Sequence, residues 1–371
     1  MDEIALVPGS RTLDPELANT EWEIGGIKRN IPILASAMDG VVDVKMSVLL
    51  SQMGAIGVIN LDGVQTRYED PNPILDQIAA VDVDGFVPLM QKLYQEPVKP
   101  ELIAKRIKEV KEQGGIAAVS STPITAGTFG PIAAEAGADL FFVQGTVVST
   151  EHLAREGAES LDIEGFCRDM PMPVILGNCV TYEVTLKLMR AGAAAILIGI
   201  GPGAACTSRG VLGVGIPQAT SIADAAAARD DFQKETGKYI PVIADGGIVT
   251  GGDVCKCIAC GADAVMMGSP FARSQEAPGR GFHWGMATPS PVLPRGTRIN
   301  VGTTGSLEQI LKGPAKLDDG THNFLGALKT SMSTLGAANL KEMQNVDVVI
   351  APSLLTEGKV YQKAQKLGMG K

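Results

Sequence analysis

One phrase recurs along this chain and constrains its fold: a helical stretch ends at Gly or Gly-Ala, and a short run of small and β-branched apolar residues follows. Five copies occupy residues 52–59, 111–119, 136–143, 191–198 and 260–267. Glycine just past a helix end supplies a left-handed cap, and a continuous apolar run is typical of a strand buried on both faces. Each copy therefore predicts a junction between a helix and a buried parallel strand.

Three further runs, at residues 31–35, 172–176 and 240–244, have the same buried-strand character and contain Pro. Eight parallel strands separated by helices predict a closed (β/α)8 TIM barrel, with an open doubly wound sheet as the alternative. An open sheet that binds a dinucleotide would carry Gly-x-Gly-x-x-Gly after its first strand, whereas the Gly-rich turns here follow late strands. We therefore expect a single catalytic barrel domain over residues 1–371.

Residues 279–307 follow strand eight and are rich in Pro, Gly, Thr and Arg, with no helical or strand period over most of their length. A loop this long inside a compact domain is usually a functional lid. We expect a long mobile active-site flap here. Residues 62–113 form a connection longer than one helix but too short for an inserted domain, and residues 324–332 and 340–343 look helical.

Charge and composition exclude several classes of partner. The chain has 41 acidic and 32 basic residues, a net charge of −9, and no stripe dense in Lys and Arg, which disfavours nucleic acid. A transmembrane helix needs about 20 apolar residues, and the longest run, residues 191–200, is shorter and contains Gly. The first residues lack the features of a secretory signal, so we expect a cytoplasmic protein with reduced thiols.

The cysteines and histidines offer little material for a metal site. Cys255, Cys257 and Cys260 are the best zinc candidates, but their spacing on a helix spreads the thiols over more than one face. Only three histidines are present. We therefore expect no zinc site.

The active site of a barrel lies at the carboxyl ends of its strands. The residues that follow the predicted strands there are Gly-rich or polar: 36–39, 177–181, 199–209, 245–247 and 268–269. The late Gly-containing turns suit a phosphate held by backbone N–H groups. The Asp245 carboxylate would accept hydrogen bonds from a sugar diol.

Cys206 is the candidate nucleophile. It lies on a loop where glycines crowd a thiol at a strand end, and the hydroxyls of Thr207 and Ser208 follow it. Such a loop presents a thiol with little steric cover. The alternative is a small buried hydrophobic residue, which is the role we assign to Cys179.

A series of motifs follows in chain order: Ala-Ser-Ala-Met-Asp at 35–39, Gly-Asn-Cys-Val-Thr at 177–181, the loop 199–209, Gly-Val-Gly-Ile-Pro-Gln at 213–218, Ala-Asp-Gly-Gly-Ile at 244–248, Gly-Ser at 268–269, Gly-Met at 285–286 and Gly-Ala-Leu-Lys-Thr-Ser-Met at 326–332. This series resembles the IMP dehydrogenase/GMP reductase family, and most closely its IMP dehydrogenase-related branch. The resemblance covers nearly the whole chain. It implies a tetrameric barrel, or a higher oligomer, that binds a purine nucleotide and a nicotinamide dinucleotide.

The resemblance also implies roles for individual residues. Cys206 would attack the purine at C2, and Thr207 would relay protons. The other substrate-binding positions are Ser36, Met38, Asn178, Ser208, Asp245, Gly246, Gly247, Gly268, Ser269, Gly285 and Met286, of which Asp245 would hold the ribose and Gly247, Gly268 and Ser269 the phosphate. Gln144, Gly199 and Gly201 would bind NAD. Backbone oxygens of Gly201, Gly203 and Cys206 would hold a monovalent cation, K⁺.

The chain also departs from the family pattern. Ala204 replaces a Ser that contacts the phosphate, and Gln144 replaces an Asp that contacts the nicotinamide ribose. Residues 62–113 leave no room for the regulatory CBS modules of IMP dehydrogenases. The Arg-Tyr pair of the flap is missing, because no Tyr occurs between Tyr239 and Tyr361.

Three functions remain open at this point. IMP dehydrogenase must activate water, whereas GMP reductase releases ammonia with the help of a flap Glu. Residues 279–307 contain no Asp or Glu, and Arg295 occupies the position of that Glu. This favours arginine-assisted hydrolysis, and hence conversion of IMP to XMP with NAD in GMP biosynthesis. Arg295 could instead be a solvated residue or a phosphate ligand.

The first alternative is a GMP reductase, which converts GMP and NADPH to IMP and ammonia, because those enzymes also lack CBS modules. The second is a non-catalytic purine nucleotide sensor, suggested by Ala204 and Gln144. Retention of Cys206 and Thr207 argues against a sensor, which needs no nucleophile.

Overall fold

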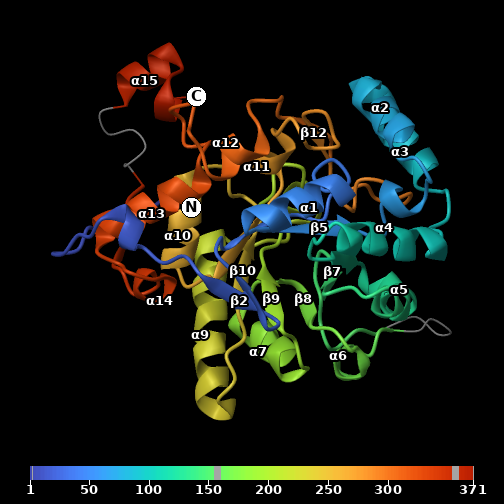
Figure 1. The fold of residues 1–371 in the computed structure, drawn as a ribbon, viewed down its shortest axis with the longest axis horizontal. Coiled ribbons are helices and arrows are strands. Elements are labelled where there is room, and N and C mark those ends of the chain that lie inside the picture. Colours follow the sequence, from blue (N-terminus) through green and yellow to red (C-terminus); the bar gives the residue numbers. More distant parts are fainter. Residues whose placement is uncertain (2, 154–159, 353–358, 371) are drawn as a thin grey trace.

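Eight parallel strands form the centre of the molecule in this computed structural model, which describes residues 1, 3–153, 160–352 and 359–370. From strand one to strand eight they are β4 (Ile33–Ala35), β5 (Ile56–Asn60), β6 (Ala118–Ser121), β7 (Leu140–Gln144), β8 (Val174–Cys179), β9 (Ala195–Ile198), β10 (Val242–Asp245) and β11 (Ala264–Met267). The sheet closes because β4 pairs with β11 as well as with β5 (Figure 1). The (β/α)8 barrel is confirmed, and the open doubly wound sheet is excluded.

The local signals for the strands act as predicted. Five glycines at the helix-to-strand junctions have φ between 72° and 113°, the left-handed region: Gly54, Gly114, Gly137, Gly192 and Gly261. The three Pro-containing runs begin two residues later than predicted, at Ile33, Val174 and Val242. Proline has no N–H to donate, so ladder pairing starts after it.

Helices surround the barrel (Figure 1). They are α1 (Val44–Met53), α4 (Pro100–Glu112), α5 (Pro123–Glu135), α6 (Ile163–Asp169), α7 (Tyr182–Arg190), α9 (Gln218–Thr236), α10 (Gly251–Ala259) and α13 (Phe324–Leu335). Side-chain caps fix several helix starts: the Asp43 carboxylate accepts the Met46 N–H at 2.7 Å, and Thr250 and Asp253 form a capping box on α10. Such caps satisfy N–H groups that a helix start leaves unpaired.

Several shorter elements lie outside the barrel. Two antiparallel pairs are β1 (Ile4–Leu6) with β14 (Val348–Ile350), and β2 (Trp22–Ile24) with β3 (Ile27–Arg29). The short helices are η1 (Pro15–Leu17), η2 (Val64–Thr66), α8 (Ser208–Leu212), α11 (Ser269–Ala272), α12 (Leu307–Leu311), α14 (Leu340–Met343), α15 (Val360–Gln365) and η3 (Gly368–Gly370). In the described part of the chain, no helix has the length and apolar character needed to span a membrane.

Two segments meet beside the mouth of the barrel. The connection between strands two and three contains α2 (Asn72–Ala80) and α3 (Val83–Leu93) in addition to α4. Residues 279–307 contain β12 (Phe282–His283) and β13 (Ile299–Asn300), which pair antiparallel and are too short to give a sequence period. Helices α2 and α3 project from the same end of the barrel as β12 (Figure 1). Trp284 and Phe282 pack with side chains of α2 and α3 in a cluster separate from the barrel core.

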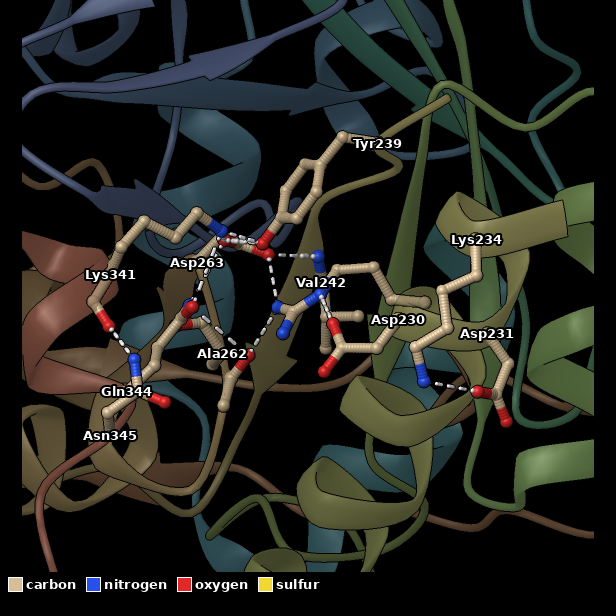
Figure 2. Close-up of polar contacts among 12 residues, drawn as sticks. Asp230, Asp231, Lys234, Tyr239, Val242, Ala262, Asp263, Lys341, Gln344 and Asn345 are labelled. Atoms are coloured by element: carbon tan, nitrogen blue, oxygen red, sulfur yellow. Dashed lines mark hydrogen bonds and ion pairs between the residues drawn. The ribbon is translucent and has the colours of Figure 1, made fainter. Parts of the chain in front are cut away.

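A buried carboxylate ties the opposite end of the barrel together (Figure 2). Asp263 precedes β11 and accepts hydrogen bonds from the Val242 N–H at 2.9 Å and from Arg229 of α9 at 3.0 Å. Lys341 of α14 donates to the other carboxylate oxygen at 2.9 Å, as does Tyr239 at 2.6 Å. Because this face carries the amino ends of the strands, the network contributes to stability rather than to a barrel active site.

Candidate functional site

Asp245 ends β10 at the mouth of the barrel, and two amides hold its carboxylate. Asn178 of β8 donates to Oδ2 at 2.8 Å, and Gln144 at the end of β7 donates to the same oxygen at 3.0 Å. Burial raises the pKa of Asp245 to about 6, and the two amide hydrogen bonds act in the opposite direction. The other carboxylate oxygen has no protein donor among the described residues, so it is available to a ligand hydroxyl.

Side-chain amides also tie neighbouring strand ends to one another. Asn178 also donates to the Gly199 carbonyl at 2.8 Å. Gln218, at the start of α9, donates to the carbonyls of Ile198 at 2.8 Å and Asp245 at 3.2 Å. A side chain at position 199 would collide with the Asp245 carbonyl, so Gly199 is required for this approach. The ends of β7 to β10 thus form a rigid polar floor.

Cys206 lies on the loop that follows β9, next to these strand ends. The thiol is partly exposed, and the Cys206 N–H donates to the Gly203 carbonyl at 3.0 Å. Arg209 spans the loop and donates to the carbonyls of Ile200 at 3.4 Å and Ile216 at 2.7 Å. The loop is therefore held at both ends while its thiol stays accessible.

The glycine turn after β10 packs against the cysteine loop. Gly246 and Gly247 have φ of 83° and 72°, which favours glycine. A Cβ at Gly247 would lie 2.9 Å from the Pro202 Cβ, and one at Gly246 would lie 3.3 Å from the Gly203 nitrogen. The structure therefore brings the candidate phosphate turn, the candidate diol carboxylate and the candidate nucleophile together.

Residues 294–297 pair with the backbone of the cysteine loop. Gly296 forms a bridge with Cys206, and the Thr297 N–H donates to the Ala205 carbonyl at 2.9 Å. The guanidinium of Arg295 donates to the Thr146 hydroxyl, after β7, at 3.2 Å. Arg295 thus sits between the ends of β7 and the cysteine loop.

The other two arginines of this segment hold structure instead. Arg280 pairs with Asp76 of α2 at 2.5 Å. Arg298 donates to the Val81 carbonyl at 2.7 Å and stacks on Phe86 and Phe282, with its guanidinium 5.1 and 4.6 Å from the ring centres.

The ends of β4 and β11 form the other side of the mouth. The Ser36 N–H donates to the Met267 carbonyl at 2.9 Å, and a Cβ at Gly268 would lie 2.8 Å from the Met38 sulfur. Ser269 shares a hydrogen bond of 2.8 Å with His283 Nε2. Ser36, Met38, Gly268 and Ser269 therefore cluster as the sequence order predicts.

The contact of His283 with Ser269 was not predicted from the sequence. Its ring is 2% exposed, its Nδ1 has no partner among the described residues, and burial lowers its pKa to about 4. A neutral imidazole therefore supports Ser269. Sparse histidine in a loop gave no sequence signal for that contact.

Ser208, Gly285, Met286 and Gly201 are further positions that the sequence predicts for the site. Ser208 is buried at the start of α8, and Gly285 and Met286 are partly exposed directly after the buried Trp284. Gly201 has φ of 78° and packs on Arg209. Cys179, Cys255 and Cys257 are buried. Among the described residues, no group of three or more His, Cys, Asp or Glu is placed to hold a metal ion.

Comparisons with known proteins agree with this arrangement. The family model for the IMP dehydrogenase / GMP reductase domain matches residues 1–288. An uncharacterized oxidoreductase of Mycobacterium leprae is 38% identical over 94% of this chain and 95% of its own. Inosine-5'-monophosphate dehydrogenase of Haemophilus influenzae is 27% identical over 92% of this chain and 91% of its own.

Among solved structures, an IMP dehydrogenase/GMP reductase-like protein from Corynebacterium glutamicum superimposes with a TM-score of 0.89 at 36% identity. The match covers 94% of this chain and 93% of that one.

Proposed function

Because the chain belongs to the IMP dehydrogenase/GMP reductase family of oxidoreductases, we propose that it converts IMP to XMP with NAD through a covalent intermediate on Cys206. The observation that carries this proposal is the position of Arg295. It is the flap arginine that lies beside the cysteine loop, on a segment without Asp or Glu. Such a flap suits activation of water better than delivery of protons to a leaving ammonia.

The nucleotide is held by residues on three sides of the mouth. Asp245 accepts the ribose hydroxyls, while Gly246, Gly247, Gly268 and Ser269 surround the phosphate. Ser36, Met38, Asn178, Ser208, Gly285 and Met286 complete the pocket for base and sugar. In the proposed binding mode, C2 of the purine faces the Cys206 sulfur.

The ends of β7 and β9 fit a nicotinamide dinucleotide, because Gln144 and Thr146 offer amide and hydroxyl groups beside the Gly199 and Gly201 backbone. When bound, it accepts the hydride that leaves C2. The carbonyls of Gly201, Gly203 and Cys206 are oxygen ligands of the kind K⁺ takes.

Residues of the chain carry out the remaining steps. The Cys206 thiolate forms a bond to C2 of IMP, and loss of hydride from C2 leaves a covalent thioimidate. The Arg295 guanidinium orients the water whose oxygen attacks C2, and Thr207 relays to solvent the proton that this water loses. Cleavage of the C2–S bond releases XMP and restores the cysteine.

We include in this proposal one catalytic barrel domain with residues 279–307 as its flap, a homotetramer or higher oligomer, and a cytoplasmic location. GMP reductase remains the second candidate, since α2, α3 and α4 fill the connection after strand two without an inserted module. A nucleotide sensor is the third.

Two assays test the proposal, both followed by the absorbance of the reduced nicotinamide. Purified protein is given IMP with NAD and, separately, GMP with NADPH. We expect reduction of NAD with IMP only. Oxidation of NADPH with GMP alone would make the protein a GMP reductase, and binding without turnover of either nucleotide would make it a sensor.

The role of Arg295 is tested by Arg295→Ala, with Arg280→Ala as the matched control on the same segment. We expect Arg295→Ala to keep the hydride burst but to lose steady-state turnover, so that covalent enzyme accumulates and is visible by intact-protein mass spectrometry. Arg280→Ala should keep both phases. Equal slowing of burst and steady state by Arg295→Ala would assign Arg295 to binding or closure.

A further inference from the structure

The hairpin of α2 and α3, residues 72–93, packs against the beginning of the flap. Trp284, which is 2% exposed, shares a hydrophobic cluster with Ile78 of α2 and Phe86 and Met90 of α3. This cluster is separate from the barrel core. The hairpin and β12 lie together beyond one end of the barrel (Figure 1). The hairpin, which belongs to the connection between strands two and three, therefore supports the flap, which follows strand eight.

A hydrogen-bonded chain crosses this contact. The indole N–H of Trp284 donates to the Tyr94 hydroxyl oxygen at 2.9 Å, and the Tyr94 hydroxyl donates to Asp39 Oδ2. The Val64 N–H donates to the other oxygen of Asp39 at 3.1 Å. Tyr94 is the C-cap residue of α3. One phenol thus joins the flap to the loop after strand one.

The hydrogen bonds from Trp284 to Tyr94 and from Tyr94 to Asp39 are buried, so water cannot readily replace them. Asp39 and Trp284 are each 2% exposed. Burial raises the pKa of Asp39 to about 6, and the hydrogen bonds from Tyr94 and Val64 counteract the increase. Deleting the phenol oxygen would leave a buried N–H and a buried carboxylate oxygen without their partner, which costs more than the bond itself contributes.

The two segments also approach each other through backbone. The Gly279 N–H donates to the Gly40 carbonyl at 3.1 Å. A Cβ at Gly40 would lie 2.6 Å from the Phe282 carbonyl oxygen and 3.2 Å from the Trp284 ring. The loop that carries Ser36 and Met38 and the segment that leads into Gly285 and Met286 are therefore fixed relative to one another.

From these contacts we infer that Tyr94 is a positioning residue that holds together the two walls of the base pocket. Met38 lies on one wall, one residue before Asp39, and Gly285 and Met286 lie on the other, directly after Trp284. The inference rests on the proposed function for the identity of the base. Tyr94 touches neither substrate nor cofactor and acts through Asp39 and Trp284.

Arg298 adds contacts between the hairpin and a later part of the flap. It donates to the Val81 carbonyl just after α2 and stacks on Phe86 of α3 and Phe282 of β12. Gln91 of α3 donates to the Ser290 carbonyl at 3.2 Å. The hairpin therefore contacts the flap at its beginning, middle and end.

The kinetic test compares Tyr94→Phe with Tyr68→Phe. Tyr68 belongs to the same cluster, but its hydroxyl donates to the Leu93 carbonyl and not to the flap. We expect Tyr94→Phe to slow the hydride burst about tenfold and to weaken binding of IMP alone less than about threefold, because ribose and phosphate contacts remain. Tyr68→Phe should change neither. Equal effects of the two variants would overturn the inference.

A spectroscopic test needs no turnover. The chain has two tryptophans, and the Trp22 indole donates to the Ile31 carbonyl at 2.8 Å, away from the flap. In full-length protein labelled with ¹⁵N-tryptophan, Tyr94→Phe should move the Trp284 indole resonance and leave that of Trp22 in place, which also reports correct folding. An unmoved Trp284 resonance would overturn the inference even if IMP proves not to be the substrate.

A second variant guards against a folding defect in the first. Trp284→Phe removes the same hydrogen bond from the other side and should reproduce the slower burst with little change in IMP binding. If Trp284→Phe leaves the burst unchanged while Tyr94→Phe slows it, Tyr94 does not act through the flap and the inference fails. Absence of any burst in wild-type protein would instead refute the proposed function, with the indole shifts still deciding the role of Tyr94.

Discussion

Replacing Gln144 with Met removes one of the two amide donors that hold the Asp245 carboxylate. Methionine has a similar length and shape but no N–H, and it leaves Asn178 as the single side-chain donor. The change tests whether Gln144 acts on the nucleotide through Asp245. It does so without removing any group that the nucleotide itself is proposed to contact.

The magnitude follows from the raised pKa of Asp245, about 6 in the intact site. A hydrogen bond to a charged group contributes about 1.5–3 kcal/mol, and about 1.36 kcal/mol corresponds to one pKa unit, so losing one donor should raise the pKa to about 7. The ionised fraction at pH 6 then falls from about one half to about one tenth, which weakens nucleotide binding about fivefold. At pH 8 both proteins are ionised, and the affinities should nearly coincide.

Isothermal titration with IMP from pH 5.5 to pH 8 measures this effect. A nucleotide that lacks both ribose hydroxyls serves as the matched ligand, because its affinity should not respond to Gln144→Met at any pH. A loss of IMP affinity that is the same at pH 6 and pH 8 would refute the reasoning. Gln144 would then act by direct contact or by packing.

Four further substitutions separate stability from function. Asp245→Asn should stabilise the fold by about 1–3 kcal/mol at pH 7. The reason is that the pKa of Asp245 is raised from 3.8 to about 6, so the wild-type fold loses stability as the pH rises between those values. The difference in the free energy of unfolding, measured by urea denaturation, should vanish below pH 4. Arg298→Ala should make residues 279–307 more susceptible to limited proteolysis while the barrel unfolds at nearly the same temperature. Arg229→Leu should lower the free energy of unfolding by about 3–5 kcal/mol, because it removes the buried ion-pair partner of the buried Asp263. Lys341→Met removes a half-exposed partner of the same carboxylate and should lower it by less than about 1 kcal/mol in the same urea denaturation.

The barrel is predictable because its signals are local. A glycine with positive φ at the end of a helix and an apolar run after it are properties of a few consecutive residues, as at Gly54 and Gly261. The barrel then follows from the five copies of this pattern together with the three Pro-containing runs, since buried parallel strands need helices on their outer face. The carboxyl ends of the strands meet at one mouth, which is why Asp245 and Cys206 were expected on the same side.

The contacts of the flap are not predictable in this way. Arg298 meets the Val81 carbonyl across 217 residues of chain, and Trp284 meets Tyr94 across 190. No residue spacing or periodicity in the sequence predicts a contact between residues so far apart. The bond between Gln144 and Asp245 was missed for a related reason: both residues were assigned to ligands, and the sequence does not tell when two ligand-facing groups bind each other first.

These long-range contacts bear on the proposed reaction by elimination. The flap carries three arginines, of which the family resemblance points to Arg295 by its position. Arg280 and Arg298 are engaged with α2 and α3, so moving either toward the thiol would break contacts that hold the flap. Arg295 donates to the single hydroxyl of Thr146 and pairs with no carboxylate among the described residues, and its neighbour Gly296 already bridges to Cys206. A shift of the Arg295 side chain would therefore cost one hydrogen bond to a neutral hydroxyl rather than an ion pair. Of the three arginines, Arg295 is thus the one that the proposed reaction could use while the flap keeps its contacts with the hairpin.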